Sequence, residues 1–174
     1  LGLSGVPLLD VNNLSIIIKG YGIYVNRNNS VTEYIIYADV AGEPDANGVR
    51  TSNGKYDDAV GTHNCSANQQ PPYTYSCCNQ VDQTTNGTLY SDCVVEIIDV
   101  SKENTSLSIE KITNSSTINY TNASINFSPP NPTITITTDS TLNPPPFTIE
   151  FFLKNTDGLD RGVLANTSGL ISVQ

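Results

Sequence analysis

Several residue types are rare or missing in this chain of 174 residues. It contains no methionine and no tryptophan, and its one histidine is His63. Because there is no methionine, Leu1 is not a translation start, and we expect the chain to be a processed or trimmed product. Lysine and arginine together number 8, against 17 aspartates and glutamates, and they are scattered along the chain. Binding to nucleic acid or to an anionic membrane surface needs a clustered basic stripe, so the sequence predicts neither partner.

The usual signals of a membrane helix or an enzyme site are also missing from the sequence. No run of 18 apolar residues occurs, so we predict no transmembrane helix within these residues. Nucleophilic catalysis needs a base beside a serine or cysteine, but His63 lies between Thr62 and Asn64 in a polar stretch. There is no Gly-x-Ser-x-Gly turn and no glycine-rich phosphate loop before a helix. We therefore expect a non-catalytic protein without an organic cofactor.

What the chain does contain favours β-structure. Hydrophobic residues make up 37% and charged residues 14%, and the balance is filled by Asn, Thr, Ser and Pro. The chain is rich in Ile, Val, Thr and Tyr, which suit a pleated, half-buried surface. Its length is sufficient for one domain with a core of its own. We predict a single, mainly β domain over residues 1–174, built as an antiparallel β-sandwich or a curled two-sheet domain.

Short strands are predicted between turn residues along most of the chain. Tyr21–Val25 and Glu33–Asp39 flank a polar turn and together predict a hairpin. Val94–Val100 is an apolar run, which predicts a strand buried on both faces. Strict alternation in Thr133–Thr137 predicts a strand with its two isoleucines turned inward. Three further strands are predicted to form an antiparallel meander, at 147–153, 161–165 and 170–173.

All four cysteines, Cys65, Cys77, Cys78 and Cys93, lie in one polar stretch. A long loop with few apolar residues cannot order itself by burial, so we predict that disulfides cross-link it. Free thiols and a zinc site are the alternatives, but zinc usually needs a Cys-x2-Cys pair or a histidine at ligand spacing, whereas Cys77 and Cys78 are adjacent. Disulfides indicate an oxidising compartment. Because a bond between adjacent cysteines would strain the backbone, we expect Cys65 and Cys93 each to pair with one of them.

One loop, between residues 39 and 61, carries a candidate metal site. Its oxygen-bearing side chains are interspersed with glycines, and calcium prefers carboxylate, amide and carbonyl oxygens on a flexible, glycine-bearing loop. The pattern does not complete an EF-hand, and an ordinary polar loop is the alternative. The candidate calcium ligands are Asp39, Asp45, Asn47, Asp57 and Asp58.

Three stretches of the sequence, taken in order, resemble the pattern of a known protein family. The first is 20–25 followed by 34–39, the second is 53–57, and the third is 125–132 with 148–151, ending in 161–173. In this order they resemble type IV pilin-like proteins of the GspH/FimT minor pseudopilin group. In that group a glycine-containing first strand leads to an aromatic-rich strand that ends in Asp. A Phe-x-Pro element follows, and a final hairpin closes on a small-residue turn with glycine.

The resemblance covers most of the chain except residues 60–92. It implies a pilin-type head domain from which the family's long N-terminal helix is missing. Residues 1–19 would then be the exit from that helix and the first segment of the head. Residues 60–93 would be a cysteine-containing loop insertion, and residues 133–173 would form the C-terminal meander.

The same resemblance implies the function. It is that of a non-catalytic structural subunit of a type IV pilus or a type II secretion pseudopilus, extracytoplasmic, on a surface filament or in the periplasm. Its partners would be other pilin or pseudopilin subunits, and it would reach the membrane and the inner-membrane assembly machinery only through the missing helix. A secreted β-sandwich adhesin or carbohydrate-binding module is the alternative, favoured by Tyr73 and Tyr75 in proline-rich loop sequence.

Overall fold

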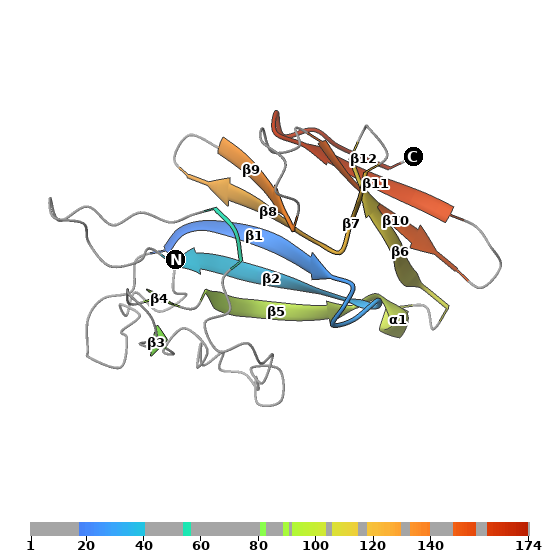
Figure 1. Cartoon of the computed structure of the whole chain (residues 1–174), viewed down its shortest axis with the longest axis horizontal. Coiled ribbons are helices and arrows are strands. Elements are labelled where there is room, and N and C mark those ends of the chain that lie inside the picture. Colours follow the sequence, from blue (N-terminus) through green and yellow to red (C-terminus); the bar gives the residue numbers. More distant parts are fainter. Residues whose placement is uncertain are drawn as a thin grey trace, which may run out of the picture.

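The fold is mainly β and consists of two five-stranded antiparallel sheets and one further two-stranded antiparallel pair (Figure 1). The computed structural model describes residues 18–40, 54–56, 81–82, 89–90, 92–103, 106–114, 118–129, 133–139, 148–155 and 160–173. The elements in chain order are β1 (Ile18–Asn26), β2 (Glu33–Val40), β3 (Val81–Asp82), β4 (Leu89–Tyr90), β5 (Cys93–Asp99), α1 (Val100–Glu103), β6 (Ser108–Thr113), β7 (Asn119–Tyr120), β8 (Asn122–Ser128), β9 (Thr133–Thr138), β10 (Thr148–Lys154), β11 (Asp160–Asn166) and β12 (Ile171–Val173). The predicted fold class, a mainly β chain with two antiparallel sheets, is confirmed.

The first sheet has the strand order β5-β2-β1-β8-β9. Its centre is the predicted hairpin of β1 and β2, which places Ile23 opposite Ile36. Asn26 shapes the hairpin turn, because its side-chain oxygen accepts from the Asn28 backbone N–H at 3.0 Å. On its other side β1 pairs with β8, a strand about a hundred residues later in the chain, with Ile23 opposite Ile125.

The second sheet has the strand order β12-β11-β10-β6-β7. The predicted meander is present as β10, β11 and β12, which pair in sequence order. The β11–β12 turn needs a glycine at Gly169, whose φ of 89° lies in the left-handed region. Asn166 supports this turn, because its side-chain oxygen accepts from the backbone N–H groups of Ser168 and Leu170, both at 3.0 Å.

The core lies between the two sheets and draws on both. Ile125 in β8 and Ile136 in β9 contribute from the first sheet, and Ile112 in β6 and Ile149 in β10 contribute from the second. Ile112 and Ile149 have no exposed surface at all. The strict alternation in β9 is confirmed, since Ile134 and Ile136 are its two buried residues. We call the surface of each sheet that looks toward the other its inner face, and the opposite surface its outer face.

Backbone contacts connect the two sheets at the end of the β1–β2 hairpin. The Arg27 backbone N–H donates to the carbonyl of Thr121, the residue between β7 and β8 where the chain crosses from one sheet to the other. The Arg27 side chain donates through Nε to the Ile109 carbonyl at 3.1 Å. The Ile109 N–H in turn donates to the Val31 carbonyl at 2.6 Å. The hairpin of the first sheet is thus fixed to β6 of the second.

Two expectations about strands need correction. The apolar run 94–100 was predicted to be buried on both faces, but β5 is the edge strand of the first sheet, and its Glu96 is exposed. The segment 133–173 does not form one meander, because β9 pairs with β8 in the first sheet and only β10–β12 form the meander. The physical reason lies in the intervening prolines 144–146, which lack N–H groups and cannot continue a ladder.

Candidate functional site

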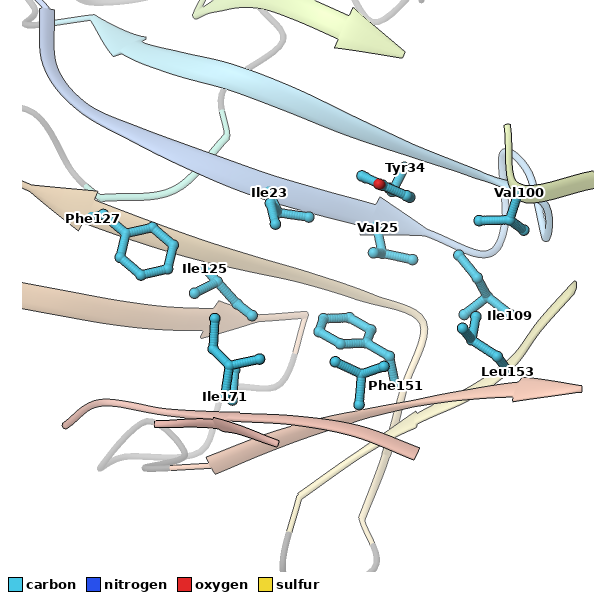
Figure 2. Close-up of a pocket in the computed structure, with 12 residues that line it drawn as sticks. Ile23, Val25, Tyr34, Val100, Ile109, Ile125, Phe127, Phe151, Leu153 and Ile171 are labelled. Atoms are coloured by element: carbon cyan, nitrogen blue, oxygen red, sulfur yellow. The ribbon is translucent and has the colours of Figure 1, made fainter. Parts of the chain in front are cut away.

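An apolar groove lies between the inner faces of the two sheets (Figure 2). Its volume is about 330 Å³, within the range of ordinary ligand pockets. The first sheet contributes Ile23 and Phe127, and the second contributes Phe151 and Leu153, which face them across the gap. Ile171 of β12 lines the groove and is 59% exposed, so the groove reaches the surface at this strand.

Among the described residues that line this groove, Tyr34 supplies the one polar side-chain group. Burial raises the pKa of its hydroxyl above the ordinary value of 10.0, and the negative charge of Glu96 raises it further. The hydroxyl is therefore neutral at physiological pH and offers one hydrogen-bonding group. All other lining residues are aliphatic or phenylalanine. Ligand pockets usually place a few convergent polar groups among apolar ones, so this groove suits an apolar chain segment better than a polar substrate.

The outer face of the first sheet is covered by a short segment, Gly54–Tyr56. The Tyr56 ring packs against Tyr24 with ring centroids 4.7 Å apart, and meets Tyr37 edge-on at 5.3 Å. The Tyr56 backbone N–H donates to the Ser124 hydroxyl at 3.0 Å. Strand β8 is buried at 123–126 for this reason, with the second sheet on one side and this segment on the other.

Two glycines of β1 make this outer face possible. A Cβ placed on Gly22 would lie 2.5 Å from the ring of Tyr37 and 2.6 Å from the Ile125 carbonyl oxygen. A Cβ placed on Gly20 would lie 2.4 Å from the side-chain oxygen of Asn126. The bare backbone of β1 therefore lets side chains from β2 and β8 lie across it. The glycine-containing first strand that carries the family resemblance has this packing role here.

Three polar side chains are buried at one end of the first sheet. Asp39, Asp92 and Asn126 are 1%, 2% and 0% exposed, respectively. The amide of Asn126 donates to the Asp39 carboxylate across Gly20. Asp92 accepts from the backbone N–H of Val40 at 2.8 Å and so holds the end of β2. The sequence predictions missed Asn126 and Asp92. The available signal for Asn126 was a polar residue between two apolar ones on a strand, at Ile125–Phe127.

The structure places one of the five predicted calcium ligands. Asp39 is buried on the outer face at the end of β2, while Asp45, Asn47, Asp57 and Asp58 lie outside the described residues. Within the described ranges, no group of three or more His, Cys, Asp or Glu side chains is arranged to hold a metal. Calcium binding stays a prediction, and a rise in thermal stability on calcium titration would test it.

The predicted cross-links stay predictions as well. Cys93 is the first residue of β5, and its backbone pairs with Ala38 of β2. Cys65, Cys77 and Cys78 lie outside the described residues, as do His63 and the two loop tyrosines, Tyr73 and Tyr75. Non-reducing mass spectrometry of the proteolysed chain would establish the pairing.

A second, smaller hollow lies on the outer face of the first sheet, beside the β1–β2 hairpin. Its volume is about 210 Å³, and its lining combines the Tyr24 ring with the polar side chains of Asn29 and Glu33. The Tyr24 hydroxyl accepts from the Asn26 amide at 2.9 Å, which fixes the edge of the ring. An aromatic ring beside amide and carboxylate groups is chemically suited to a sugar, although the volume is below that of ordinary ligand pockets.

Comparisons with known proteins found no match from which a family or a function could be assigned to this chain. No protein-family model matches it, and neither does any curated protein or solved structure. In the part of the chain that the structure describes, no helix is long and apolar enough to span a bilayer. The residues themselves are therefore the basis for the functional proposal.

Proposed function

We propose that this chain is the β-rich head of an extracytoplasmic filament subunit of the type IV pilin or pseudopilin kind, and that it performs no chemistry itself. The observation that carries the proposal is the apolar groove between the sheets. A subunit of this kind joins its head to an apolar helix, and such a helix needs an apolar surface on the head. Residues from both sheets, such as Ile23 and Phe151, provide that surface.

The reach of the chain is compatible with this arrangement. Seventeen residues precede β1, and an extended chain spans at most about 3.3–3.6 Å per residue. A segment of that length can pass from the start of β1 to any point on a domain of this size. The groove is also open at its surface end, at Ile171. An α-helix with its side chains is about 10–12 Å across, so the groove would take apolar side chains of a preceding helix, and the helix itself would lie at its mouth.

Residues from each of the three stretches of the family resemblance pack together on the outer face of the first sheet. Gly22 of the first stretch accommodates Tyr37, Tyr56 of the second stretch packs on Tyr37, and Asn126 of the third stretch donates to Asp39. These residues are far apart in sequence, so their contact supports the resemblance as a structural pattern. Each motif alone is short, and this contact adds weight to the order of the parts that meet there; 148–151 and 161–173 of the third stretch lie in the second sheet.

The complete precursor gives the direct test of this proposal. We expect a short basic leader before Leu1, followed by about 20 apolar residues with a glutamate near their start. An ordinary cleaved signal peptide in that position would contradict the proposal. In the producing cells, an antibody against this chain should label surface or periplasmic filaments, and filaments that stay unlabelled would count against it.

The small hollow on the outer face favours a second candidate, a carbohydrate-binding or adhesive module. In that case a glycan would stack on Tyr24 and bond to Asn29 and Glu33. A glycan array compares the parent chain with the exposed-residue variants Asn29→Ala and Glu33→Ala. Binding that both variants lose would favour this candidate, and an array without any bound glycan would remove it.

A further inference from the structure

The last strand, β12, leaves an apolar edge of the second sheet open. Among the described strands it pairs with β11 alone, and its three residues lie opposite Val163, Leu164 and Ala165. Six large hydrophobic side chains are exposed among the described residues, and three of them lie in Leu170–Val173. Leu170, Ile171 and Val173 are 56%, 59% and 71% exposed. A contiguous apolar group on a strand edge is a site where another strand can add.

The other three edges of the two five-stranded sheets carry features that discourage such pairing. Strand β5 has the exposed Glu96 and a register shift opposite Ile36 and Tyr37. Strand β9 carries threonines on the face away from the core, and β7 has only two residues. Charges, irregularities and short length are the usual means by which proteins protect sheet edges. Strand β12 is short, but it has no charge, no proline and no irregularity in its pairing.

The hydrogen-bond pattern identifies which backbone groups of β12 are directed outward. The Asn166 N–H donates to the Leu170 carbonyl at 3.1 Å, so the backbone of Leu170 faces β11. In an antiparallel ladder this direction alternates from residue to residue, so Ser172 also faces β11. The N–H and C=O groups of Ile171 and Val173 therefore point to the open edge. Their side chains lie on the inner face, in line with Ala165 and Val163.

We propose that β12 pairs with the β12 of a second copy of this chain, antiparallel and about a twofold axis at Ser172. In this register Ile171 of each copy lies opposite Val173 of the other. The two symmetry-related Ile171–Val173 pairs are both hydrogen-bonded pairs, which gives four backbone hydrogen bonds across the axis. Ser172 then lies opposite its own equivalent at a non-hydrogen-bonded position. The apolar inner-face side chains of the two copies form β-branched cross-strand pairs, which favour such an interface.

The symmetry and the chemistry of this edge indicate that its partner is a second copy of the chain. A twofold pairing requires a surface that is complementary to itself, and Ile171-Ser172-Val173 has similar side chains on either side of its centre. The interface itself contains no charge. Each chain carries a net charge of −9, however, so the two copies repel at long range, and salt screens that repulsion. Two three-residue strands bury less than the roughly 800 Å² per partner of a standard interface, so the contact is weak and concentration-dependent.

Sedimentation velocity over a range of protein concentrations tests this inference, with and without added salt. We expect a monomer–dimer equilibrium that shifts toward dimer as concentration and salt rise. Val173→Lys places a charge that must be desolvated on pairing, and we expect it to weaken dimerisation at least about tenfold. The matched control is Val31→Lys, which adds the same charge at another exposed valine, in the β1–β2 turn.

A cross-linking experiment tests the register. Cα atoms at non-hydrogen-bonded antiparallel positions lie about 4.5 Å apart, which is within the range that a disulfide can join. Oxidation of Ser172→Cys should therefore give a covalent dimer, whereas Ser168→Cys, in the exposed β11–β12 turn, should give much less. A chain that stays monomeric throughout, or a dimer that both lysine variants weaken equally, would overturn the inference. The inference does not depend on the filament proposal, and the precursor sequence has no bearing on it.

Discussion

At the scale of single residues, Gly22 has an unusually specific role. The ring of Tyr37, which is fully buried, occupies the space where a side chain at position 22 would lie. We expect Gly22→Ala to lower the free energy of unfolding by about 1–3 kcal/mol, because the tyrosine or the backbone must move. Urea unfolding measures the loss. In a Tyr37→Leu background the same change should cost less, and strictly additive effects would contradict the proposed contact.

Two tyrosine hydroxyls of the core region differ in how they are satisfied. The Tyr120 side chain is 2% exposed, and its hydroxyl has no hydrogen-bond partner among the described residues. Burial, followed by the nearby charge of Asp139, raises the pKa of this hydroxyl. The Tyr24 hydroxyl, in contrast, accepts a hydrogen bond from Asn26 at 2.9 Å.

This difference predicts opposite effects of the same substitution. Tyr120→Phe removes an unpaired buried hydroxyl and should raise the free energy of unfolding by about 1 kcal/mol. Tyr24→Phe removes a paired hydroxyl and should lower the free energy of unfolding by about 0.5–1.5 kcal/mol. Paired urea titrations under one set of conditions compare them. Equal losses in both variants would mean that the Tyr120 hydroxyl is satisfied in solution.

At the scale of elements, the sequence predicted strands better than their partners. The alternation of Thr133–Thr137 identified β9 and its buried residues, because a period of two follows directly from strand geometry. The apolar run of β5 misled the prediction, although Glu96 in its middle indicated an edge. The pairing of β1 with β8 could not be read from the sequence, because it joins residues about a hundred positions apart. Local propensity carries no information on such non-local contacts.

The candidate sites were harder to predict for the same reason. The groove takes its lining from strands of both sheets, so no local motif encodes it. Asp39 was selected as an oxygen-bearing residue beside a glycine-rich loop, and the structure places it against Asn126 on a strand two positions away in the same sheet. The contact between Asp39 and Asn126 depends on the order of the strands in the sheet. The sequence therefore indicated which residue types matter, but not which side chains they contact.

The short helix α1 provides a prediction at the scale of one element. Asp99 precedes it and acts as its N-cap, accepting from the Ser101 hydroxyl at 2.6 Å and from the Ser101 N–H at 3.0 Å. The Ser101 side chain is the main cause that lowers the pKa of Asp99, with further lowering by Thr32 and Lys102. A lowered folded pKa stabilises the fold above the unfolded pKa, near 4, and this stabilisation is lost as the pH falls through the folded value.

We therefore expect Ser101→Ala to raise the pKa of Asp99 toward its unfolded value. The protonation of Asp99 below about pH 4 should then cost the fold less stability in this variant than in the parent chain. NMR titration of the Asp99 carboxyl measures the first effect, and urea unfolding at a series of pH values measures the second. Ser168→Ala, a serine in the β11–β12 turn, is the control. An unchanged pKa of Asp99 in the Ser101 variant would contradict the capping contact.

At the scale of the whole molecule, the shared core determines how the two sheets unfold. Ile149 belongs to the second sheet and Ile125 to the first, yet both are buried in one cluster. The backbone contacts of Arg27 and Ile109 join the sheets at the hairpin end. A domain with one such core unfolds as one cooperative unit, so neither sheet should persist without the other.

This argument predicts the result of opening the core from one side. Ile149→Ala should lower the free energy of unfolding by about 2–5 kcal/mol through lost burial and the cavity left behind. Hydrogen exchange should then report the same loss of protection in β8 of the first sheet as in β10, although the substitution lies only in the second. Ile118→Ala, at a side chain that is 38% exposed, should change either strand little. If β8 kept its full protection in the Ile149 variant, the two sheets would be separate folding units, and the groove between them would be a joint between independent halves.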